Sequence, residues 1–321
     1  MSEVAANESD PEIKPGFLDE LSSFWGALPE RAAFLMLAGA WVLLFSLFGN
    51  STFGYVDTGS LFSWMYTAYN APLSEDGHGN LIPFVVLGLI WWKRETLLSI
   101  KLEAWPLALP LILGALILHV LGFVAQQPRL SIIALITGFY GIMGLCWGRQ
   151  WMRHVLFPYA LLVFCIPIGS LANVITFPLR LVVSELAVWV ATNILQLDII
   201  REGTMIFDGD RSFQFDVAPA CSGIRSLVTL FALTTIYGFM TFETVWRRGV
   251  MMLASVPFAI IGNVMRITTV VVVGDVYGQE TGLKIEQNLG FLTFLVAIVG
   301  VMILGHFLAE NRPAVSEEVD E

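Results

Sequence analysis

Apolar stretches long enough to cross a lipid bilayer recur along this chain from about residue 32 to residue 309. A membrane-spanning helix needs about 20 mostly apolar residues, and it satisfies its own backbone hydrogen bonds within the hydrocarbon. Charged residues make up only 14% of the chain, whereas soluble domains contain about 25%. The sequence therefore predicts an all-α polytopic membrane protein.

Eight segments are predicted to cross the membrane. They are about Ala32–Phe48, a segment from Pro83 to Trp92, Trp105–Val124, Leu130–Cys146, Val155–Ile168, Ser222–Met240, Val250–Val273 and Leu289–Leu308. The first follows an acidic tail and lacks the basic start of a cleaved signal peptide, so we expect it to remain as an anchor. The predicted organisation is an acidic tail over 1–30, one transmembrane domain over 31–309 and a second acidic tail over 310–321, both tails being cytoplasmic.

Basic residues between the apolar segments predict the orientation, because lysine and arginine concentrate on the cytoplasmic side. Three pairs, Lys93–Arg94, Arg149–Arg153 and Arg247–Arg248, fall on one side only if residues 171–197 do not cross the membrane. This stretch contains Pro178 and several polar residues, so we interpret it as a re-entrant or interfacial helix on the outer side. The termini are then cytoplasmic, in a multi-pass protein of the cytoplasmic membrane.

Residues 198–217 contain the strand signal of the sequence. Thr204–Asp208 and Ser212–Val217 flank an Asp-Gly-Asp turn, and Phe213, Phe215 and Val217 alternate onto one face. We expect a small β-hairpin over the outer membrane surface.

Cys221 follows this hairpin at the point where a polar segment becomes an apolar helix. A thiol near the first turn of a helix faces unpaired N–H groups, which favour the thiolate. Arg225 lies at i+4 on the same helical face and adds a positive charge. Cys221 is therefore a candidate nucleophile; the alternative is a small residue packed at a helix start.

Arg266 lies in the outer part of the seventh predicted span, at the level expected for Cys221. An ionisable residue inside a span is expensive and marks a candidate functional site. Arg266 is suited to stabilising a thiolate or an oxyanion, and Asn263, one turn earlier, to orienting it or donating a hydrogen bond. The alternative is an arginine that reaches the outer headgroups.

These motifs together resemble the exosortase/archaeosortase family of membrane cysteine transpeptidases. The matching segments are Ala220–Arg225 around the cysteine, Asn263–Ile267 for an Asn-x-x-Arg element, His78–Pro83 before the second span, Ile166–Pro167 and Pro178–Leu179. The resemblance runs from about residue 60 to residue 308, and it implies that Cys221 is the nucleophile.

One position departs from the family pattern. The family's histidine, four residues before a glycine, corresponds here to Glu286 before Gly290. A glutamic acid desolvated at the membrane interface can take over acid/base work, or it can only pair with Arg266. His78, on the outer side, is a further candidate for the proton transfer. His306 is predicted near the cytoplasmic end of the last span, away from the site.

The resemblance implies a protease/transpeptidase that cleaves C-terminal sorting signals of exported proteins at the outer face of the cytoplasmic membrane. Its partners would be the lipid bilayer and substrates with a recognition motif, a transmembrane helix and a basic tail. We expect no cofactor, no metal and no nucleic acid, because no ligand spacing and no basic patch is present. A non-catalytic relative and a small-solute transporter or pore remain the alternatives.

Overall fold

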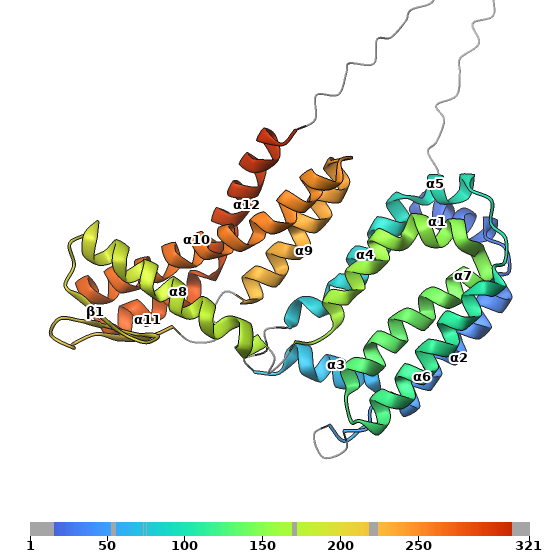
Figure 1. Cartoon of the computed structure of the whole chain (residues 1–321), viewed down its shortest axis with the longest axis horizontal. Helices are drawn as coiled ribbons and strands as arrows, with labels where there is room; N and C mark the ends of the chain where they lie inside the picture. Colours follow the sequence, from blue (N-terminus) through green and yellow to red (C-terminus); the bar gives the residue numbers. More distant parts are fainter. Residues whose placement is uncertain are drawn as a thin grey trace, which may run out of the picture. The chain divides into compact units, whose positions relative to one another are not determined.

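The computed structural model describes residues 16–52, 56–72, 74, 76–168, 172–217 and 224–309, which are mainly helical (Figure 1). Its elements are α1 (Phe17–Ala27), α2 (Arg31–Phe48), α3 (Leu61–Asn70), η1 (Gly77–Asn80), α4 (Ile82–Trp92), α5 (Arg94–Ser99), η2 (Pro106–Ala108), α6 (Leu109–Val124), α7 (Pro128–Ala160), η3 (Leu161–Cys165), α8 (Ala172–Asn193), β1 (Ile199–Glu202), β2 (Met205–Asp208), β3 (Gln214–Asp216), α9 (Ile224–Thr241), α10 (Val245–Tyr277), α11 (Gln279–Asn288) and α12 (Gly290–Phe307).

The apolar helices confirm a multi-pass α-helical membrane protein. Within the described residues, four helical segments are long and apolar enough to cross a bilayer: Arg31–Phe48, Pro106–Val124, Pro128–Cys165 and Val245–Tyr277. Three shorter apolar helices are Ile82–Trp92, Leu227–Thr241 and Phe294–Phe307. Each of the eight predicted spans overlaps one of these seven segments, and Pro128–Cys165 overlaps two of the predicted spans. Helix α8 is not among the described helices that are long and apolar enough to cross a bilayer.

Gly148 explains how α7 holds two predicted spans. Its φ of 93° lies in the left-handed region, which interrupts the helical dihedrals inside α7. A Cβ at this position would also lie 2.2 Å from the carbonyl oxygen of Glu103. The helix therefore kinks where the basic residues predicted a loop.

The chain divides into two compact units. The first comprises Met1–Trp64 and Pro83–Val163, and the second Met65–Ile82 and Phe164–Glu321. In the first unit α2, α6 and α7 pack together, and Trp41 Nε1 donates a hydrogen bond to the Leu135 carbonyl at 3.0 Å. The second unit contains all the residues with a proposed role in chemistry.

The sheet of the second unit confirms the predicted hairpin and adds a strand. β2 pairs antiparallel with β3, and β1 pairs antiparallel with the other edge of β2. The Asp208 carboxylate holds the turn by accepting hydrogen bonds from the Ser212 hydroxyl and from the Phe213 N–H at 2.8 Å. Both hydrogen bonds favour the charged carboxylate, the one from Ser212 most strongly, and they keep the Asp208 pKa below its ordinary value.

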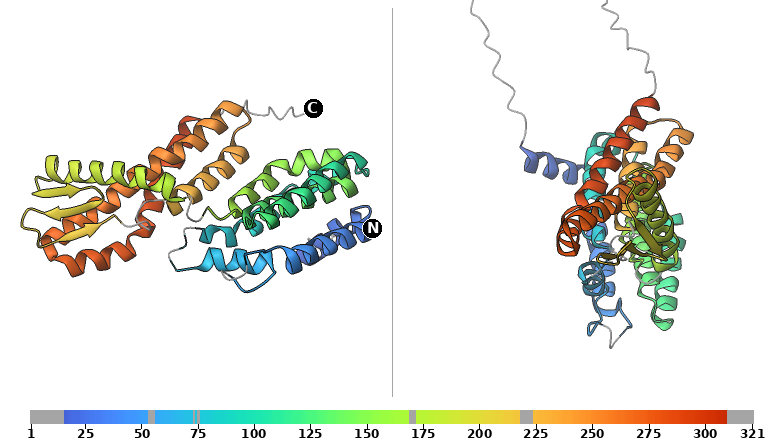
Figure 2. Two further views of the ribbon diagram at one scale, coloured as in Figure 1. Left: turned by 60° about the horizontal axis from the view of Figure 1, so that its bottom comes forward. Right: turned by 90° about the vertical axis from the view of Figure 1, so that its left-hand side faces the viewer.

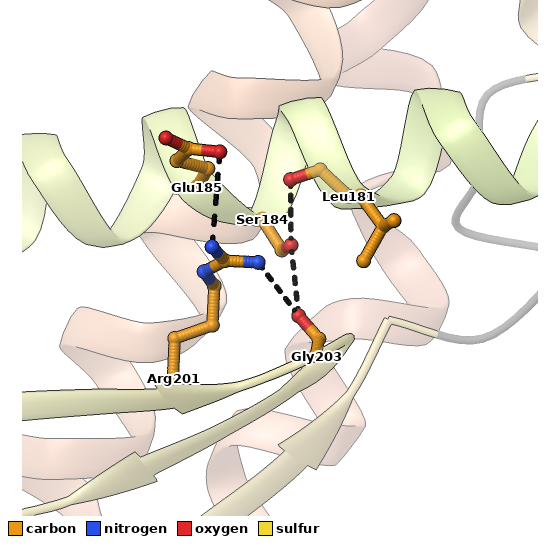
Figure 3. A network of polar contacts seen from close by, with 5 residues as sticks. All are labelled: Leu181, Ser184, Glu185, Arg201 and Gly203. Atoms are coloured by element: carbon orange, nitrogen blue, oxygen red, sulfur yellow. Dashed lines mark hydrogen bonds and ion pairs between the residues drawn. The ribbon is translucent and has the colours of Figure 1, made fainter.

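Polar contacts fix the sheet against α8 (Figure 3). Ser184 is fully buried, and its Oγ lies 3.0 Å from the Leu181 carbonyl oxygen and 3.4 Å from that of Gly203. Arg201 donates to the same Gly203 carbonyl at 3.0 Å and lies 3.7 Å from Glu185 of α8. The loop between β1 and β2 is thereby tied to the middle of α8.

The other edge of the sheet is joined to α11, which follows α10 (Figure 2). Gln279 exchanges two hydrogen bonds with the backbone of Gln214 in β3, at 2.8 and 2.7 Å. This occupies backbone groups that an edge strand would otherwise leave open. The Phe213 ring lies against Gly274 of α10, where a Cβ would approach it to 2.2 Å. Hairpin, α10 and α11 therefore form one packed region.

Candidate functional site

Helix α10 connects the two apolar clusters of the second unit. Its Ile267, Val270 and Val271 pack with buried residues of α8 and the sheet, which we call the sheet cluster. Its Met251 and Ala259 pack with buried residues of α9 and α12, which we call the helix cluster. Along α10, the Asn-x-x-Arg element follows Ala259 of the helix cluster and directly precedes Ile267 of the sheet cluster.

Asn263 is the most completely buried polar residue of this element. Its side chain is 0% exposed, and neither Nδ2 nor Oδ1 has a hydrogen-bond partner among the described residues. A buried polar group without a partner typically costs about 1–3 kcal/mol of stability. The Asn263 amide makes no hydrogen bond to the Arg266 guanidinium in this structure, and its role beside Arg266 stays a prediction.

Arg266 binds the end of α11. Its Nη2 donates a hydrogen bond to the main-chain carbonyl of Glu286 at 3.1 Å. Glu286 lies in the last turn of α11, where carbonyls lack helical partners and a positive charge is favoured. The Arg266 Nε is buried and has no hydrogen-bond partner within the described part of the chain. Nη2 therefore makes a structural hydrogen bond to α11, whereas the Nε–H is not bonded to any described residue.

The structure brings Glu286 to Arg266 through its backbone. The polar helix α11 runs back along α10 after the turn at Gly278, and Gly282 approaches the Gly274 backbone closely. Glu286 is half-buried, and its main-chain carbonyl oxygen accepts the hydrogen bond from Arg266. The backbone of residue 286 therefore helps to hold the arginine.

His78 belongs to the same compact unit as Arg266 and Glu286, although it is distant in sequence. It lies in η1, which contacts α9. The neighbouring Asp76 is buried and accepts a hydrogen bond from the Ile168 N–H at 2.9 Å. The Tyr69 hydroxyl donates to the Cys165 carbonyl, and burial raises the Tyr69 pKa. These contacts anchor the His78 segment to residues 165–168.

Sequence reasoning gave no role to these anchors or to Arg180. Arg180 lies on α8 one turn before Val183 of the sheet cluster, with its guanidinium 5.4 Å from the Phe177 ring centre. Its Nε is buried without a hydrogen-bond partner among the described residues. The sequence feature that could have identified Arg180 is its position as a charged residue inside an apolar stretch. For Asp76 and Tyr69 we find no comparable signal, because their partners are distant in sequence.

The predicted nucleophile lies outside the described residues. Cys221 itself is not among the described residues. The backbone of Arg225 is described and belongs to the first turn of α9, but its side chain is not described. The described residues on either side are placed in the two clusters: Val217 is buried in the sheet cluster, and Leu227 packs against the helix cluster. The connection that carries Cys221 therefore links the same two clusters as the Asn263–Arg266 part of α10.

The described residues contain no group of three histidine, cysteine or acidic side chains arranged to hold a metal ion. The fold and this region define a multi-pass helical membrane protein with a buried asparagine and a half-buried arginine on one helix.

The sequence matches the family described as Transmembrane exosortase (Exosortase_EpsH) over residues 70–303. This range covers well over half of the 321 residues, so the chain belongs to the transmembrane exosortase family. Membership supports a membrane transpeptidase role in general. Searches among curated proteins and among solved structures gave no significant match.

Proposed function

We propose that the protein is a membrane-embedded cysteine protease/transpeptidase that cleaves C-terminal sorting signals of exported proteins at the outer face of the cytoplasmic membrane. The observation that carries this proposal is the half-buried Arg266, whose Nε is shielded from solvent and which lies on α10 between Ala259 of the helix cluster and Ile267 of the sheet cluster. A fixed positive charge at such a place suits a thiolate and a developing oxyanion.

The reaction follows ordinary acyl transfer. The Cys221 thiolate forms a bond to the substrate carbonyl carbon, and the carbonyl π electrons move to the oxygen. Collapse of this intermediate breaks the C–N bond, and the leaving amine takes a proton from an acid, for which Glu286 is our first candidate and His78 the second. The transmembrane helix and basic tail of the substrate depart on the amine, and an amine or water then resolves the thioester.

The length of α10 supports an outer position for the site. The helix runs without a charged residue from Gly249 to Met265, and Arg248 and Arg266 bound this stretch. At 1.5 Å per residue, these two arginines lie about 27 Å apart along the axis, close to the roughly 30 Å of the hydrocarbon core. If Arg247 and Arg248 are cytoplasmic, Arg266, α11 and the sheet lie at the outer face.

A non-catalytic relative is the second candidate, and one contact favours it. Arg266 caps α11 through the Glu286 carbonyl, which gives this arginine a structural purpose independent of chemistry. A protein that had lost turnover would keep this contact, but it would not need a reactive thiol at Cys221.

Thiol labelling in intact cells tests the proposal and its orientation. With Cys146 and Cys165 replaced by alanine, an impermeant maleimide should modify Cys221 from outside. Arg266→Gln should slow this modification about tenfold or more at neutral pH, since loss of a neighbouring positive charge raises a thiol pKa by about a unit or more. An inert Cys221 in both proteins would favour the non-catalytic relative or a transporter.

Two introduced cysteines serve as topology controls. Asp210→Cys at the exposed hairpin turn should react in intact cells, and Val245→Cys, 80% exposed at the start of α10, should react only after permeabilisation. Both controls are made in a chain without native cysteines. The opposite pattern would place the site in the cytoplasm and contradict the proposed orientation.

A further inference from the structure

The Asn263 amide is a polar group that the fold itself does not use. It is completely buried, and its two polar atoms find no partner among the described residues. An apolar side chain with the same branching, such as leucine, would occupy this site without losing hydration. Packing between the two clusters therefore does not explain an asparagine at this position.

Asn263 and Arg266 present hydrogen-bond donors on the same side of α10. Residues three apart in a helix are neighbours on its surface. The asparagine contributes the two N–H groups of Nδ2, and the arginine contributes its unpartnered Nε–H. The Arg266 Nη2 is already bonded to the Glu286 carbonyl, which limits the movement of the guanidinium. The result is a pair of pre-positioned donors shielded from water.

Donors of this kind act most strongly on an oxygen that becomes negative during a reaction. Their effect is larger where water is excluded, and they need no reorganisation when the charge develops. A thiolate attack on a peptide carbonyl produces such an oxygen. The Asn263 Oδ1 is at the same time able to accept a hydrogen bond from a peptide N–H, so the carboxamide matches both polar groups of a peptide backbone.

We propose that Asn263 is a catalytic residue whose Nδ2–H donates to the carbonyl oxygen of the peptide bond under attack, with Arg266 Nε as the second donor. This assignment rests on the proposed function. As the sulfur–carbon bond forms, the π electrons move to that oxygen, and the two donors stabilise its negative charge. When the C–N bond breaks, the electrons return to the carbonyl and the thioester remains held by the same donors.

The test compares Asn263→Leu and Asn263→Asp with the wild-type enzyme on a sorting-signal substrate. Leucine removes both polar atoms, and aspartate keeps the shape and an acceptor but has no N–H donor. Each variant should lower kcat by about 10²–10³-fold, the usual effect of removing one oxyanion donor, with little change in KM. The melting temperature of Asn263→Leu in detergent should not fall, because the wild-type amide lacks a protein partner.

Thr268→Val is the matched control. The Thr268 Oγ1 is another buried atom of α10 without a hydrogen-bond partner in the described part of the chain, but its spacing from Asn263 places it on a different side of the helix. This variant should keep wild-type kcat.

Wild-type kcat in Asn263→Asp would overturn the donor role, as would failure of both Asn263 variants to fold, since the amide would then be structural. Absence of turnover in the wild-type enzyme would instead count against the proposed function itself.

Discussion

Replacing Cys221 with alanine or serine is expected to abolish substrate processing while the protein still folds and inserts. The thiolate is the proposed nucleophile, and a serine hydroxyl at this position lacks a base strong enough to activate it. The measurement is the conversion of a tagged substrate protein to its shorter form, followed over time in membranes containing equal amounts of each variant.

Cys146→Ala supplies the control for this experiment. Cys146 is buried in α7 of the first unit, so its loss should leave processing intact and show that removing a membrane cysteine is tolerated. Undiminished processing in Cys221→Ala would end the cysteine-enzyme proposal. Loss of processing only in the alanine variant would point to a hydroxyl-competent site with a stronger base than we propose.

Glu286→Gln is expected to reduce processing by about 10²–10⁴-fold, the usual effect of removing a general acid. Glutamine keeps the size and hydrogen bonding of the side chain but has no proton to give to the leaving amine. Arg266 binds the backbone carbonyl of residue 286, and that carbonyl is still present after the substitution. The variant therefore removes the acid and leaves that contact in place.

Glu286→His should restore part of the lost activity, since it recreates the group that the family uses. The control is Glu280→Gln, which removes an exposed α11 carboxylate that pairs with Lys284 at 2.7 Å and should leave the rate unchanged. His78→Ala, assayed in parallel, tests the competing assignment. Processing that survives in Glu286→Gln and disappears in His78→Ala would transfer the acid role to His78.

Much of the membrane architecture could be predicted, because apolar length and basic flanks report directly on spans. The hairpin was predictable for a similar local reason: its Asp-Gly-Asp turn and the alternation of Phe213 and Phe215 lie within a few residues. The kink was not, because basic residues within α7 suggested a loop between two spans. The left-handed φ of Gly148 shows that α7 kinks there instead.

Strand β1 was missed because its Ile199–Ile200–Arg201–Glu202 sequence does not alternate. Its pairing with β2 and the Arg201 contacts to Gly203 and Glu185 define it. Tertiary pairing rather than local pattern decides such short strands.

Part of the candidate site could be predicted, because the sequence shows which polar residues are energetically costly inside a membrane span. An arginine inside an apolar segment is expensive, which identified Arg266 and directed attention to Asn263. The atom that Arg266 binds was not predictable, because it depends on how α11 runs back along α10. The anchoring of the His78 segment by Asp76 and Ile168 likewise joins residues far apart in the chain.

The most direct test of the central claim is to trap the acyl-enzyme. Wild-type protein is incubated with a tagged substrate, quenched in acid and analysed without reducing agent, and the modified peptide is located by mass spectrometry. We predict a hydroxylamine-sensitive thioester between Cys221 and the substrate residue on the amino side of the cleaved bond, more abundant when the acceptor amine is withheld. Efficient processing with no adduct on Cys221, or with the adduct on another residue, would contradict the account.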